Sequence, residues 1–163
     1  MVNCVALGQH NRAVEQQISK IESICNTFIH SNGGVNFDNN KLTVINCDEK
    51  LYTNESHTDT IDVNYKDIVF AQYGSVTYEG NLLNPKTTIK SLYVTTKNDA
   101  VSTKFGKSNV FVISMNEDIT DDIIIDLIRS FQTLVNESGG YYIQNMQPNT
   151  LNKINLGQLN NWK

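Results

Sequence analysis

The sequence has little charge and a modest share of apolar residues. Charged residues make up 18% and hydrophobic residues 39% of the 163 residues, below the roughly 25% and 45–50% of average globular domains. The polar residues that replace them are mostly Asn, Thr and Ser. The length still matches one domain of about 100–200 residues, so we expect a single sizeable core.

Positive charge is also in short supply. Lys and Arg number 13 against 17 Asp and Glu, which gives a net charge of -4. Proteins that bind nucleic acid broadly present a basic face, so nucleic-acid binding is not expected.

The first residues, "MVNCVALGQHNRAVEQQ", lack a charged stretch followed by a long apolar run. We expect neither a signal peptide nor a membrane span.

The three cysteines form no CxxC pair, and an odd number is a poor disulfide framework. This favours a reducing, cytoplasmic location. Cys25 lies among apolar residues of a predicted helix, which favours a small core residue over a nucleophile. The three histidines are not at helical i,i+4 spacing from one another or from a cysteine. We therefore predict no metal and no cofactor.

The segment from Asn11 to about residue 31 is predicted to be an amphipathic helix. Asn11 is a plausible N-cap, and "SNGG", residues 31–34, supplies residues that tolerate a left-handed helix end. Apolar residues recur at spacings of four and three, and they form one stripe: Val14, Ile18, Ile21, Cys25 and Phe28.

From about residue 35 to 115 the apolar period changes to two, which predicts strands. Val35 and Phe37 are expected to pair with Leu42 and Val44 across a turn at "NN", residues 39–40. A short strand near residues 51–52 and a loop through His57 are expected next. Residues 97–108 are interpreted as a charged turn.

The stretch "TIDVNYKDIVFAQYGSV", residues 60–76, predicts two strands around a pivot at "YKD". Val69, Ala71 and Tyr73 are expected on one side of the second strand. The strand at residues 110–115 is apolar on both faces, which favours a central strand or one covered by a helix.

A second amphipathic helix is predicted at about 120–137. Thr120 is its expected cap, and Asp121 and Asp122 suit the positive end of the helix dipole. Its apolar stripe contains Ile124, Leu127, Ile128, Phe131 and Leu134.

The predicted fold is α+β: an antiparallel sheet or partly open barrel of about seven strands, with an N-terminal helix and a closing C-terminal helix. Residues 1–138 are predicted to form the domain and 139–163 an extended tail. The passages "TIDVNYKDIVFAQYG" and "NVFVISMNEDITDDIIIDLIRSFQTLV" resemble strands three to four and the closing helix of the pleckstrin-homology-like (PH-like) superfamily. The resemblance covers about residues 35–136. A profilin-like or roadblock-type sheet between helices is the alternative.

Two sequence motifs resemble ligand-binding sites but are better explained without a ligand. "GKS", residues 106–108, lacks the first glycine of a phosphate-binding loop because Val101 stands there, and it opens a strand rather than a helix. Acidic residues crowd the start of the second helix, where capping and solvation explain them better than cation binding. They are Glu117, Asp118, Asp121, Asp122 and Asp126.

The preferred function is a non-catalytic protein–protein interaction or assembly module. Its expected contacts are the helix residues Val14, Ile18, Ile21 and Phe28 and the tail residues Leu151, Ile154, Leu159 and Trp162. A cluster of lysines could give weak contact with anionic lipid or an acidic partner, although lysines also protect edge strands. The cluster is Lys86, Lys90, Lys97, Lys104 and Lys107.

Two alternatives stay open. One is a small enzyme with an unrecognised pocket, for which Asp118, Asp122, His57 and Cys47 are the best candidates. The other is a structural component of a virus or another large assembly.

Overall fold

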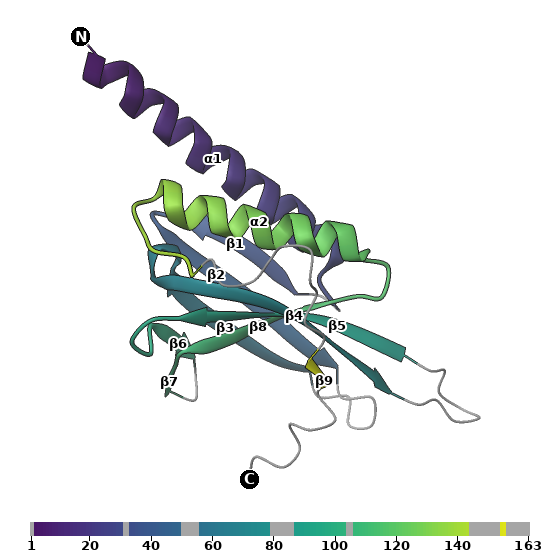
Figure 1. Cartoon of the computed structure of the whole chain (residues 1–163). Helices are drawn as coiled ribbons and strands as arrows, with labels where there is room; N and C mark the ends of the chain where they lie inside the picture. Colours follow the sequence, from purple (N-terminus) through teal and green to yellow (C-terminus); the bar gives the residue numbers. More distant parts are fainter. Residues whose placement is uncertain are drawn as a thin grey trace.

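The computed structural model has the predicted α+β fold with the two predicted helices, but its strands are divided between two sheets and do not form the single sheet or partly open barrel that was expected (Figure 1). The structure describes residues 2–30, 33–49, 56–78, 87–103, 106–143 and 154–155. Helix α1 (Val2–Phe28) and helix α2 (Asp121–Glu137) lie side by side and cover the sheets. Buried side chains from both helices and both sheets form one core.

The first sheet has the strand order β1-β2-β3-β6-β7. Its strands are β1 (Gly34–Asp38), β2 (Lys41–Glu49), β3 (Ser56–Asn64), β6 (Val101–Thr103) and β7 (Gly106–Ser108). The predicted hairpin pairing of Val35 with Val44 and of Phe37 with Leu42 is confirmed. Asn39 and Asn40 make its turn at φ values of 46° and 68°, a conformation that Asn tolerates better than most residues.

The second sheet has the order β8-β5-β4-β9. Its strands are β4 (Ile68–Tyr78), β5 (Thr87–Thr96), β8 (Val110–Met115) and β9 (Ile154–Asn155). The strands β4, β5 and β8 pair antiparallel, whereas β9 lies parallel to β4. In the part of the chain that the structure describes, both sheets are open.

The "YKD" pivot is a 3-10 helix, η1 (Tyr65–Asp67), and here the chain passes from the first sheet to the second. Tyr65 fixes it to the first hairpin, because its hydroxyl donates to Asn40 Oδ1 at 2.7 Å and its ring lies 6.0 Å from that of Phe37. At the other sheet, the Lys97 N–H donates to the Asp67 carbonyl at 2.9 Å. The pivot therefore joins the two sheets at a fixed position.

The second helix matches its prediction closely. The Thr120 side chain accepts from the Ile123 N–H, and Asp121 and Asp122 occupy the first turn. The apolar stripe faces the core, with Ile128 partly buried and the other four positions fully buried. Packing of this stripe, more than helix propensity, holds such a helix in a fold.

Several local predictions are wrong. Helix α1 begins at Val2, so Asn11 lies inside the helix and is not its N-cap, and the helix ends at Phe28. His57 belongs to β3, where it pairs with Asp48, and not to a loop. The expected turn at 97–108 contains β6 and β7, which add to the first sheet through Asp62 and Ser102. These strands are too short for a periodic pattern to reveal.

Two strand predictions also need correction. Strand β8 is not central, because it is the last strand in its sheet order, but α1 contacts it, in line with the alternative that a helix covers it. Its outer edge is occupied instead, because the His30 N–H donates to the Ser114 carbonyl and the Asn116 N–H donates to the Phe28 carbonyl. In β4 the register shifts between Ile68 and Phe70, so Ile68 and not Val69 is fully buried with Ala71 and Tyr73.

Candidate interaction surfaces

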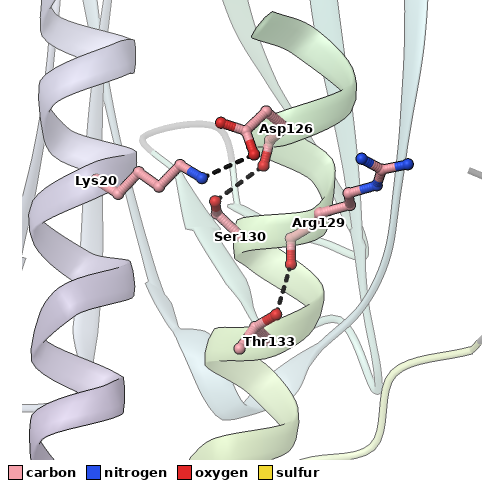
Figure 2. Close-up of polar contacts among 5 residues, drawn as sticks. All are labelled: Lys20, Asp126, Arg129, Ser130 and Thr133. Carbon is pink, nitrogen blue, oxygen red and sulfur yellow. Dashed lines mark hydrogen bonds and ion pairs between the residues drawn. The ribbon is translucent and has the colours of Figure 1, made fainter. Parts of the chain in front are cut away.

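The stripe of α1 packs mainly inside the domain. Ile21 and Cys25 are fully buried, while Val14, Ile18 and Phe28 are partly buried against the core. A polar contact joins the two helices: Lys20 Nζ lies 2.7 Å from Asp126 Oδ1 (Figure 2). Figure 2 also shows Arg129 pointing away from α1. The predicted contact residues of this helix thus attach α1 to its own domain.

The first turns of α1 differ from the rest of the helix. At 1.5 Å per residue, the 27-residue α1 is about 40 Å long and the 17-residue α2 only about 25 Å. Figure 1 shows the N-terminal end of α1 projecting past α2 and past both sheets, with no described element beside it. This segment is helical backbone without described tertiary support.

Side chains of α1 cover the outer edge of β1. The Val35 N–H donates to Asn26 Oδ1 at 2.8 Å, and Asn26 Nδ2 donates to the Val35 carbonyl at 3.0 Å. The Phe37 N–H donates to Glu22 Oε1 at 2.8 Å. The free backbone groups of an uncovered edge strand can pair with a strand of another chain. Here the side-chain hydrogen bonds of α1 satisfy backbone groups of Val35 and Phe37 at that edge.

The outer edge of β4 is covered by the chain that follows α2. The Ile143 N–H donates to the Val69 carbonyl at 2.8 Å, and the Ala71 N–H donates to the Tyr142 hydroxyl at 2.9 Å. Tyr142 belongs to the core, and burial raises the pKa of its phenol to about 12. No sequence pattern connects Tyr142 with Ala71, so this contact escaped prediction.

Of the predicted tail contacts, only Ile154 is described. It lies in β9 and pairs with Gly74 of β4. Leu151, Leu159 and Trp162 lie outside the described residues.

The predicted lysine cluster is divided. The Lys90 ammonium donates to the Ile119 carbonyl, and Lys97 Nζ lies 3.0 Å from Asp67 Oδ1. Lys107 is exposed on β7, and Lys86 and Lys104 lie outside the described residues. Two of the three described lysines thus already contact acceptors of their own chain, and an anionic-lipid contact stays a prediction.

The candidate catalytic residues are not brought together. Burial raises the pKa of the Cys25 thiol to about 12, so the thiolate that acts as a nucleophile is strongly disfavoured. Cys47 and His57 lie on neighbouring strands, whereas Asp118 lies in the turn before α2 and Asp122 in its first turn. Within the described residues, no three His, Cys, Asp or Glu side chains form a group that could hold a metal ion.

An open depression on α2 is lined by Asp122, Ile123, Ile125, Asp126 and Arg129. The Asp126 carboxylate in it is already paired with Lys20, and its backbone carbonyl accepts from Ser130. The depression is therefore a solvent-facing side of α2.

Comparison of the chain with protein-family models, curated proteins and solved structures gave no match. The PH-like resemblance therefore stays a hypothesis about strand order and pattern. Neither helix in the described part of the chain combines the length and apolar character needed to cross a lipid bilayer.

Proposed function

We propose that the chain is a non-catalytic protein–protein interaction and assembly module, and that the first turns of α1 form its contact with a second copy. The observation that carries the proposal is the projection of α1 beyond the domain (Figure 1). Short helices without packing are marginally stable in water. A projecting helical segment therefore gains stability when another surface packs against it.

The sequence of the projecting turns supports helix pairing. Leu7 precedes Val14 by seven residues, and Val14 precedes Ile21 by the same interval. A seven-residue apolar repeat is typical of helices that pack along one another. The stripe that attaches α1 to its domain therefore continues, in sequence, into the turns that project.

The proposal includes a cytoplasmic location, which suits the free, buried thiol of Cys25. A structural role in a larger assembly, including a viral one, would be a version of the same function. No specific observation favours the enzyme alternative.

Light scattering after gel filtration tests the proposal. The native chain is expected to exceed its monomer mass of 18.4 kDa, and Leu7→Glu to return it to that mass. Gln9→Glu is the matched control, because it adds the same charge two residues away, on nearly the opposite side of the helix at about 100° per residue. A native chain that stays monomeric, or equal masses for the native chain and Leu7→Glu, would contradict the proposal.

A further inference from the structure

The edge of β4 holds two kinds of contact. One is fixed at the start of the strand, where buried Tyr142 and the neighbouring Ile143 bond to Ala71 and Val69. The other lies further along, where β9 pairs in parallel with Gly74 and Ser75. Tyr142 and Ile143 follow α2 closely in the chain, whereas β9 comes after ten further residues.

The pairing with β9 is short. Strand β4 has 11 residues and β9 has two. Each backbone hydrogen bond contributes a net stabilisation of only about 0.5–1.5 kcal/mol, and ordering each residue costs about 1–2 kcal/mol in backbone entropy. Such a pairing can separate without unfolding the core that holds β4.

The connection before β9 is longer than its span within one copy requires. Residues 144–153 separate Ile143 from Ile154, and these ten residues can span up to about 33–36 Å when extended. Their attachment points on β4, Val69 and Gly74, are five residues apart, which is only about 17 Å along a strand.

We propose that the β4 edge also accepts β9 of a second copy, so that two assembled copies exchange their C-terminal strands. The same residues pair in the same register in either arrangement, so exchange loses no contact, as in domain swapping. The inference rests on the assembly proposed above, because a two-residue pairing needs the high local concentration that an existing contact supplies.

Disulfide trapping in the full chain tests the exchange. Cys4→Ser and Cys47→Ser remove two native thiols, and buried Cys25 is retained because its raised pKa, about 12, suppresses its reactivity. One chain then carries Ser75→Cys and another carries Asn155→Cys, since these positions are register partners. Neighbouring strands lie about 4.7–4.9 Å apart, within the Cα spacing that a disulfide accepts.

Mild oxidation of the mixed chains is expected to give a covalent dimer containing one chain of each kind. The matched control replaces Asn155→Cys with Lys107→Cys, an exposed position on β7. A dimer yield several-fold above that of this control supports exchange. Equal yields would show random collision and would overturn it.

A chain carrying both Ser75→Cys and Asn155→Cys, prepared with and without Leu7→Glu, separates the two proposals. If the native chain assembles but the doubly substituted chain without Leu7→Glu is trapped only within one chain, strand exchange is wrong and assembly stands. If the separate chains still form the disulfide dimer with Leu7→Glu present, exchange stands and the α1 contact is wrong. If the doubly substituted chain traps nothing, β9 does not occupy the edge and the inference fails.

Discussion

The Asn26 side chain forms hydrogen bonds with both backbone groups of Val35, accepting from its N–H at 2.8 Å and donating to its carbonyl at 3.0 Å. One amide therefore does what a neighbouring strand would do for this position. Asn is suited to the role because it carries a donor and an acceptor together. The contact joins the end of α1 to the outermost strand of the first sheet.

Replacing Asn26→Ala is expected to lower the free energy of unfolding by about 0.5–1.5 kcal/mol, since the two bonds are partly solvated. Hydrogen exchange at the Val35 amide should also accelerate. Asn136→Ala, the same substitution at an exposed position of α2, is the control and should stay within about 0.5 kcal/mol. Unchanged Val35 exchange in Asn26→Ala would contradict the role of the side chain.

Ile21→Asp is expected to lower the free energy of unfolding by about 4 kcal/mol or more, because it places a carboxylate in the core without a partner. The side chain of Ile21 projects from α1 into the core and is fully buried there. Ser19→Asp adds the same group at an exposed position of α1 and should have little effect. Equal denaturant midpoints for the two variants would show that the α1 stripe is not packed.

Tyr142→Phe should cost about 1–3 kcal/mol, because it leaves the buried Ala71 N–H without its acceptor. Tyr141→Phe is the matched control, since that neighbouring side chain is 76% exposed. Denaturant unfolding of both variants measures the difference. Identical stabilities would mean that the hydroxyl contributes nothing at the β4 edge.

Tyr142 also predicts an alkaline loss of stability. Burial raises its pKa from the ordinary 10.0 to about 12 in the folded protein. Because the neutral phenol is favoured by folding, this contribution is complete below pH 10 and is lost as the pH rises towards 12. Unfolding measured across this range should show a decline that Tyr142→Phe reduces. A decline of the same size in the variant would assign it to other groups.

Asp62→Asn is expected to cost at most about 1 kcal/mol at neutral pH, since the Asp62 and Lys41 side chains are both substantially exposed. A hydrogen bond from Lys41, aided by one from Thr43, lowers the Asp62 pKa below its ordinary 3.8. The contribution is therefore present above pH 3.8 and disappears as the pH falls through the lowered pKa. Added salt should also shrink it. A difference between native and variant that persists in acid would contradict this origin.

The sequence by itself determined the elements whose signal is local. The α2 stripe and its Thr120 cap lie within consecutive turns of one helix, and the Asn39–Asn40 turn fixes the register of the first hairpin. The "YKD" pivot was also visible, because strand periodicity breaks there. In each case the deciding residues are near neighbours in the chain, so spacing alone carries the information.

Tertiary structure decided what depends on residues far apart in sequence. Asn26 and Val35 are nine residues apart, and Tyr142 and Ala71 are 71 apart. The placement of β3 and β4 in different sheets and the pairing of β9 with β4 also depend on residues far apart in sequence. Such contacts follow from where a sheet leaves unpaired N–H and carbonyl groups, and only the assembled fold brings side chains or strands to those groups.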